Sequence, residues 1–197
     1  VSPGDTSPYS ATSSMAIDPI YIALTDVPEF ARAGGIDALD PQTRAALAAA
    51  RDARSVHYVA VRHAKTDALS RAFDLFFHEE WGPHTPRAAG LADYIAREGW
   101  WLDDFALYAA IVSATGLGHW HHWPPHLRDR DPDAMDEARR HLAREILRQQ
   151  YLQWIAETQW QRAKTEAHAV GVTIFGDFPF MVSGAGPDVW VRPEEVM

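Results

Sequence analysis

The carboxylate best placed to belong to a functional site in this sequence is Asp177, which directly follows an apolar run and a glycine. The run, residues 172–175, is β-branched and aromatic, as expected of a strand buried on both faces of a parallel sheet. In α/β barrels the loops after the strands line one open face, where active-site groups lie. Asp is also a common turn residue or cap, so the position alone leaves a structural role open.

Several histidines could hold a metal ion by residue type. They lack the i, i+4 helical spacing with an acidic partner that is typical of H-E-x-x-H sites. We therefore expect packing or solvent exposure, and no metal, for His119, His121, His122 and His126.

Two pairs of adjacent carboxylates, Glu79-Glu80 and Asp103-Asp104, imitate an acid/base pair. Adjacent residues on a helix point in different directions, so we do not expect the two carboxylates within either pair to face one another. Solvated helix faces or caps are the simpler expectation.

The composition limits the class of protein. With 197 residues, 47% of them hydrophobic, the chain can form a domain with a sizeable core. A formal charge of -9 disfavours nucleic-acid and anionic-membrane partners. The chain has no cysteine, which excludes disulfides and thiolate sites and makes the cytosol the default compartment. No run approaches the roughly 20 apolar residues of a bilayer span, and no signal peptide is visible.

The elements that must position Asp177 are mostly helices. Residues 1–18 are rich in Pro, Gly, Ser and Thr, which predicts an extended surface loop. Asp40-Pro41 is an N-cap followed by Pro at the first helical position. Caps and apolar periodicity predict helices over 40–53, 56–81, 85–96, 102–113 and 131–170, with Gly99 separating the third from the fourth. The sequence begins at Val1 and ends just after a charged stretch, so we expect a part of a longer protein.

Four groups of motifs occur in an order that is typical of one enzyme family. They are D-T-S-P-Y-S over 5–10 with D-P-I-Y-I over 18–22, W-L-D-D-F-A-L-Y over 101–108, L-R-D-R-D over 127–131 with Y-L-Q-W over 151–154, and G-D-F-P-F-M-V over 176–182 with D-V-W over 188–190. The chain thereby resembles, over essentially its whole length, the amylomaltase or disproportionating-enzyme family of 4-alpha-glucanotransferases.

Two departures from the family pattern concern a local turn and the sugar site. Asp18 stands where the family usually has Asn. Ala185 stands where the family's D-S-A-D-V-W motif has its first Asp, which in relatives borders the sugar site. Loss of a hydrogen-bond partner at such a site typically costs about 1–3 kcal/mol in recognition.

The resemblance implies an α/β fold, an incomplete (β/α)8 TIM barrel with a large helical inserted subdomain. It divides the chain into an N-terminal barrel loop (1–39), a helical insertion with a barrel helix (40–170), and a barrel strand with its active-site loop (171–197). We expect three strands or fewer, and coordinates dominated by helices.

The implied activity is transfer of an alpha-1,4-glucan segment to glucose or another glucan by double displacement. An Asp nucleophile and a Glu acid/base do this chemistry in retaining enzymes. The family's R-I-D-H nucleophile motif is missing from these 197 residues, so we expect no catalytic residue here, no cofactor, and an inactive chain.

The resemblance also implies partners and a site. The partners are alpha-1,4-glucans, maltooligosaccharides and glucose, and the compartment is the cytoplasm. The substrate-binding candidates are Tyr9, Asp177, Asp188 and Trp190. Asp177 would hold the sugar by hydrogen bonds, and the two aromatic rings offer faces on which pyranose rings stack. Trp190 is equally well explained as a core anchor.

Two other functions remain open. The chain is alternatively a non-catalytic carbohydrate-binding or interaction module, or the product of a decayed gene. A coding sequence that continues into an R-I-D-H motif would favour the transferase, and a stop codon after Met197 would favour the others.

Overall fold

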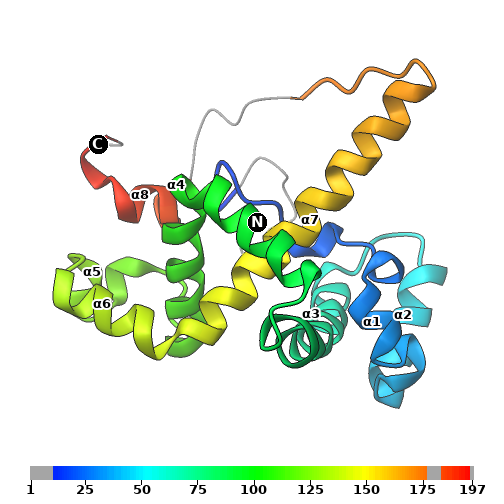
Figure 1. The fold of residues 1–197 in the computed structure, drawn as a ribbon, viewed down its shortest axis with the longest axis horizontal. Coiled ribbons are helices and arrows are strands. Elements are labelled where there is room, and N and C mark those ends of the chain that lie inside the picture. The colour runs from blue at the N-terminus through cyan, green and yellow to red at the C-terminus, as the bar shows by residue number, and fades with distance from the viewer. Residues whose placement is uncertain (1–10, 177–182, 196–197) are drawn as a thin grey trace. The chain divides into compact units, whose positions relative to one another are not determined.

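Helices are the main secondary structure in the computed structural model, which describes residues 11–176 and 183–195 (Figure 1). No strand is present in these two ranges. The α-helices are α1 (Pro28–Arg32), α2 (Pro41–Asp52), α3 (Tyr58–Phe76), α4 (Pro86–Thr115), α5 (Pro125–Arg128), α6 (Pro132–His141), α7 (Ala143–Ala169) and α8 (Pro187–Val191). Short 3-10 turns and one π-helical turn join them: η1 (Pro19–Tyr21), η2 (Leu24–Asp26), η3 (Gly35–Ala38), η4 (Phe77–Trp81, the π turn), η5 (Trp120–His122) and η6 (Pro193–Glu195).

Two helices begin where the sequence predicts an N-cap. The Asp40 carboxylate accepts hydrogen bonds from the amides of Gln42 and Thr43, both at 2.9 Å, at the start of α2. The Asp131 carboxylate accepts from the amide of Ala134 at 3.1 Å, at the start of α6. Each bond satisfies an amide that has no partner within its own helix, so both predicted starts are confirmed.

Glycines end two helices as predicted. Gly116 follows α4 with φ 69°, and Gly171 follows α7 with φ 76°. This left-handed backbone closes a helix at little cost only when no Cβ is present. The helix expected over 56–81 is also confirmed, as α3 with the π turn η4.

The expected break at Gly99 is wrong, because α4 runs without interruption from Pro86 to Thr115. A glycine inside a helix costs only about 1 kcal/mol relative to Ala. Tyr94 and Leu102, on either side of Gly99, are both buried. Continuing the helix buries both side chains, and this burial outweighs the unfavourable helix propensity of Gly99.

The single helix expected over 131–170 is also wrong. It divides at Leu142 into α6 and α7. Leu142 has φ -102° and ψ 14°, and its side chain packs against a buried cluster described below. No Gly or Pro marks this break, so local pattern could not reveal it.

The strand expected over 172–175 is not formed. These residues have no regular secondary structure, and the side chains of Val172, Ile174 and Phe175 are exposed, Phe175 to 96%. A strand takes its hydrogen bonds from neighbouring strands, and the part of the chain that the structure describes offers none.

The chain divides into two compact units, with boundaries inside α4 and α7. The first comprises 1–16, 94–151 and 176–197. Its buried cluster consists of Leu107, Tyr108, Ile111, Trp123, Met135, Ala138 and Trp190. The expected segments 1–39, 40–170 and 171–197, which are parts of one incomplete catalytic domain, stay a prediction.

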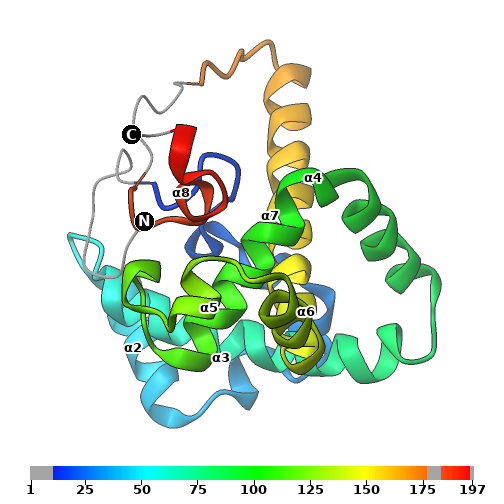
Figure 2. The same ribbon diagram turned by 90° about the vertical axis from the view of Figure 1, so that its left-hand side faces the viewer.

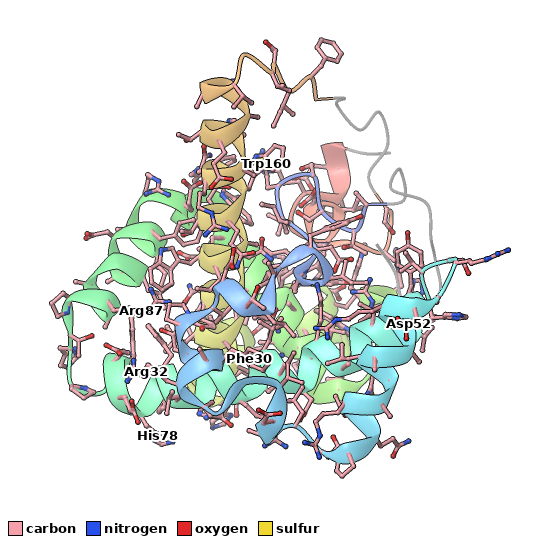
Figure 3. All side chains as sticks on the ribbon, turned by 90° about the vertical axis from the view of Figure 1, so that its right-hand side faces the viewer. Phe30, Arg32, Asp52, His78, Arg87 and Trp160 are labelled. Carbon is pink, nitrogen blue, oxygen red and sulfur yellow. The ribbon has the colours of Figure 1, made fainter. Side chains whose placement is uncertain are left out.

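The second unit comprises 17–93 and 152–175. Phe73 and Phe76 of α3 are fully buried, and the ring of Phe76 lies 6.1 Å from that of Trp154. Glu29 of α1 is also fully buried. Its Oε2 accepts from Nη2 of Arg87 at 2.9 Å, and Figure 3 labels this arginine. The buried carboxylate is therefore compensated by a guanidinium.

Asp18, where the family usually has Asn, has a defined partner in this unit. Its two carboxylate oxygens accept from Nη1 and Nη2 of Arg62 at 2.9 and 2.8 Å, and Oδ1 also accepts from the Ile20 amide at 3.0 Å. Burial opposes ionisation of Asp18, but these bonds outweigh it and hold the pKa of the carboxyl below its ordinary value. Asp18 thus forms a bidentate ion pair with Arg62.

Candidate functional site

Two segments far apart in the sequence meet in the first unit, residues 11–16 and residues 183–191. Figure 2 shows the latter segment, with α8 in red, beside the blue start of the described chain. The Ser183 amide donates to the Ala11 carbonyl at 3.3 Å. A Cβ built on Gly186 would overlap the Thr12 carbonyl oxygen. We call this contact the loop junction; its Ser183 lies six residues after Asp177, and its Ala11 two residues after Tyr9.

Asp188 makes two side-chain hydrogen bonds across the loop junction. Its Oδ1 accepts from the Ser13 hydroxyl at 3.2 Å, and its Oδ2 accepts from the Ser14 amide at 2.7 Å. The Ser13 hydroxyl oxygen in turn accepts from the amides of Met15 and Ala16, at 3.2 and 3.4 Å. A hydroxyl has a single proton. Because Ser13 acts as an acceptor toward the two amides, its proton remains to be donated to Asp188.

Trp190 lies in the buried cluster and is 1% exposed. Its Nε1 donates to the Leu127 carbonyl at 3.1 Å. Its ring centroid lies 5.7 Å from that of Tyr108 and 5.3 Å from that of Trp123. The Cζ atom of Arg130 lies 4.3 Å from the same centroid. These contacts favour the core anchor over the sugar platform for Trp190.

Local geometry explains why Asp188 and Trp190 have different surroundings. Gly186 allows the close approach to Thr12, and Pro187 at the first position sets the φ angle that α8 needs. Two residues along a helix correspond to a rotation of roughly 200°. Trp190 therefore enters the core while Asp188 faces the segment 11–16.

The backbone before α8 is fixed by aromatic side chains. The Tyr108 hydroxyl lies within hydrogen-bond distance of the Ala185 carbonyl and, at 3.1 Å, of the Gly118 carbonyl, so its single proton is shared between these two acceptors. The Trp120 Nε1 donates to the Gly184 carbonyl at 3.0 Å. Burial raises the pKa of the Tyr108 hydroxyl to about 12. Tyr108 therefore keeps its proton even at moderately alkaline pH and acts as a donor.

The adjacent carboxylates lie on helical segments as expected, but Glu79 and Glu80 meet at one arginine and Asp104 is ion-paired, so solvated faces that point in different directions are a wrong expectation for them. Asp104 accepts from Nη2 of Arg130 at 2.7 Å. Burial, followed by the charge of Asp104, raises the pKa of the Asp103 carboxyl. Glu79 and Glu80 both pair with Arg32.

The four histidines of the 119–126 connection are all exposed. The ring of His121 stacks on Trp120 with centroids 3.7 Å apart. Within the ranges 11–176 and 183–195, no three His, Asp or Glu side chains come together as metal ligands. None of the helices there is long and apolar enough to cross a membrane.

The structure brings two of the four predicted site residues, Asp188 and Trp190, into the loop junction and its core. Tyr9 and Asp177 lie outside the described residues. The sequence pattern did not identify Ser13 and Gly186. Each has a role only through its contact with the other segment of the loop junction. The L-R-D-R-D motif contains Arg130, but it did not indicate that the Arg130 side chain lies over the Trp190 ring.

A separate cavity of about 520 Å³ lies in the second unit. It is bounded by residues 17–26 and the C-terminal half of α7, which carries Trp160 (labelled in Figure 3). Its lining is mainly apolar and includes Asp26 and Arg162, which form an ion pair. It contains none of the predicted site residues.

Comparison with known proteins gives concordant results. A family model described as 4-alpha-glucanotransferase matches residues 1–197. The 4-alpha-glucanotransferase of Thermus thermophilus is 35% identical over 188 residues, which are 95% of this chain and 35% of the relative. The 4-alpha-glucanotransferase of a Synechocystis strain is 30% identical over 190 residues, again 95% and 35% of the two chains.

A solved structure has the same fold over the matched part. It is described as amylomaltase from Streptococcus agalactiae in complex with acarbose, with a TM-score of 0.76 and 24% identity. The match covers 95% of this chain and 36% of that one. The chain thus spans about a third of the length of the relatives it matches.

Proposed function

Because this chain belongs to the 4-alpha-glucanotransferase family, we propose that it is part of an enzyme that transfers alpha-1,4-glucan segments to glucose or to another glucan. The observation that carries the proposal is the family match over all of residues 1–197. Transfer proceeds by retaining double displacement, with a glycosyl-enzyme intermediate on an Asp and a Glu as acid/base. The partners are alpha-1,4-glucans, maltooligosaccharides and glucose.

In this proposal the chain contributes sugar binding but no chemistry. The R-I-D-H motif of the nucleophile does not occur in its sequence. Tyr9 and Asp177 are the proposed sugar contacts, one from each segment that enters the loop junction. The bonds of Asp188 to Ser13 and Ser14 support a common site for the two segments, because they hold the described parts of both together.

The proposed architecture of the complete enzyme is a (β/α)8 barrel. The likeness to the amylomaltase structure supports it. The exposed apolar side chains of residues 172–175 support it as well, since such a run is typical of a strand covered on both faces. We propose the cytoplasm as the compartment, because the sequence has no cysteine to form disulfides.

Two measurements on the purified 197-residue chain test the proposal. Calorimetric titration with maltotriose and longer maltooligosaccharides should show binding at millimolar concentrations. The β-linked cellotriose serves as the matched control and should bind more weakly, because an alpha-glucan site recognises the shape of the linkage. The Asp177→Ala variant should lose most of the maltooligosaccharide binding.

The second measurement is a transfer assay. Incubation with maltotriose should release no glucose, because the nucleophile and the acid/base are missing from the sequence. Glucose release by the purified chain would show that other carboxylates suffice. Equal binding of the two trisaccharides, or none at all, would contradict a glucan site in this chain.

A further inference from the structure

We propose that Asp188 is a positioning residue, which holds the segment 11–16 in place for sugar binding without contacting the sugar itself. This differs from the direct role expected from the sequence. The link to sugar binding rests on the proposed function. That Asp188 holds the segment 11–16 in place rests only on the contacts of the loop junction, so it can be tested separately.

Both oxygens of the Asp188 carboxylate are used within the protein. Oδ2 accepts from the Ser14 amide at 2.7 Å, and Oδ1 accepts from the Ser13 hydroxyl at 3.2 Å. Hydrogen bonds to an ionised acceptor are stronger than those between neutral groups. These bonds join residues that are more than 170 positions apart in the sequence.

The two sides of the loop junction differ in how firmly they are held. α8 is anchored by Trp190, whose ring is closed in by Tyr108, Trp123 and Arg130. The backbone that leads to it is fixed by Tyr108 at Ala185. Asp188 is therefore presented by a rigid element.

The segment 11–16 has no helix or strand of its own. Its conformation depends on the local turn at Ser13 and on two kinds of hydrogen bond to the other segment. The Ser183 amide donates to this segment, and the Asp188 carboxylate accepts from it. Asp188 consequently determines the path of the chain two to five residues after Tyr9. A sugar contact made next to this segment would therefore depend on Asp188.

Amide hydrogen exchange tests the positioning directly. In the 197-residue chain, Asp188→Ala should speed exchange of the Ser14 amide about 10-fold or more, because the amide loses its acceptor. The Gly116 amide at the end of α4, which donates to the Val112 carbonyl at 2.9 Å, reports on the remainder of the same unit and should be unchanged. Asp136→Ala, which removes an exposed carboxylate on α6, should affect neither amide.

Asp188→Asn provides a milder variant if Asp188→Ala does not fold. The Asn carbonyl oxygen can still accept from the Ser14 amide, so protection should be largely retained. Unchanged Ser14 exchange in a folded Asp188→Ala variant would overturn the proposal.

A double-mutant cycle separates positioning from direct sugar contact. Maltooligosaccharide binding should weaken roughly 10-fold in Asp188→Ala and a few-fold in Ser13→Ala. If Asp188 acts through the segment 11–16, the double variant should resemble Asp188→Ala alone, because coupled residues are not additive. Fully additive losses would instead assign Asp188 a direct contact and overturn the proposal.

Failure of the proposed function gives a different result. A wild-type chain that binds no maltooligosaccharide would refute a glucan site. The exchange of the Ser14 amide would then still decide whether Asp188 positions the segment 11–16.

Discussion

The guanidinium of Arg130 lies over the indole ring of Trp190, with its Cζ atom 4.3 Å from the ring centroid. The same guanidinium donates to Asp104 of α4 at 2.7 Å. Its Nη1 is buried and has no partner among the residues described. Arg130 also has a positive φ of 56°, which side chains with a Cβ rarely adopt. The side-chain contacts of Arg130 therefore compensate for backbone strain.

Two substitutions of Arg130 should separate side-chain contacts from strain. Arg130→Ala removes the contacts to Trp190 and Asp104, and we expect a loss of about 1–2 kcal/mol in the free energy of unfolding. Arg130→Gly removes the same contacts but relieves the strain, so it should be more stable than Arg130→Ala by up to ~1 kcal/mol. Urea unfolding measures both. An Arg130→Ala variant as stable as wild type would show that neither contact matters.

The close approach at Gly186 predicts a steric effect. Gly186→Ala places a Cβ against the Thr12 carbonyl, and we expect a loss of about 1–3 kcal/mol in unfolding free energy. The φ of Gly186 is -87°, so strain of the backbone is not involved. Gly184→Ala is the matched control, because a Cβ there meets nothing within 4 Å. Equal stability of the two variants in urea would contradict the close contact.

The ion pair of Asp18 with Arg62 predicts a dependence on pH. The folded pKa of Asp18 is lowered, so its contribution is present above the unfolded value of about 3.9 and is lost as the pH falls through the folded pKa. Asp18→Asn should lower the unfolding free energy by about 1–2 kcal/mol at pH 7. The difference from wild type should shrink as the pH is lowered below about 4.

An exposed ion pair serves as the control for Asp18. Asp67 accepts from Arg71 at 3.2 Å, one helical turn away on the surface of α3. Asp67→Asn should change the unfolding free energy by at most a few tenths of a kcal/mol. A difference between wild type and Asp18→Asn that does not vary with pH would argue against the ion pair as its cause.

Tyr108 predicts the opposite dependence at alkaline pH. Its folded pKa is raised to about 12, so its contribution is complete below the unfolded value of about 10 and is lost as the pH rises toward 12. Between pH 10 and 12 the free energy of unfolding of the wild type should fall by about 1 kcal/mol more per pH unit than that of Tyr108→Phe. Unfolding curves of the two proteins at pH 9 to 12 measure this. Parallel pH profiles would mean that Tyr108 ionises freely.

Ala185 predicts an effect on recognition. Restoring the carboxylate that the family resemblance places here, with Ala185→Asp, should strengthen maltooligosaccharide binding about 10-fold. Ala185→Asn adds a side chain of the same size without charge, and its gain should be smaller. Calorimetric titration compares the variants. A change of less than twofold in Ala185→Asp would show that this position does not border the sugar.

The sequence by itself determined the family and most helix ends. The cap at Asp40 and the glycine at Gly116 act on amides and carbonyls within about four residues of themselves. Such bonds are encoded locally, so the pattern of nearby residues was sufficient. The motifs over 5–10 and 176–190 likewise identified the family from short stretches.

Only the tertiary structure decided which distant groups meet. The strand predicted over 172–175 requires neighbouring strands, which the described chain does not supply, and its side chains are exposed. Trp190 is closed in by residues from three other segments, and the partners of Asp188 lie more than 170 residues away. Pairings of this kind depend on how the whole chain packs, and no local pattern contains that information.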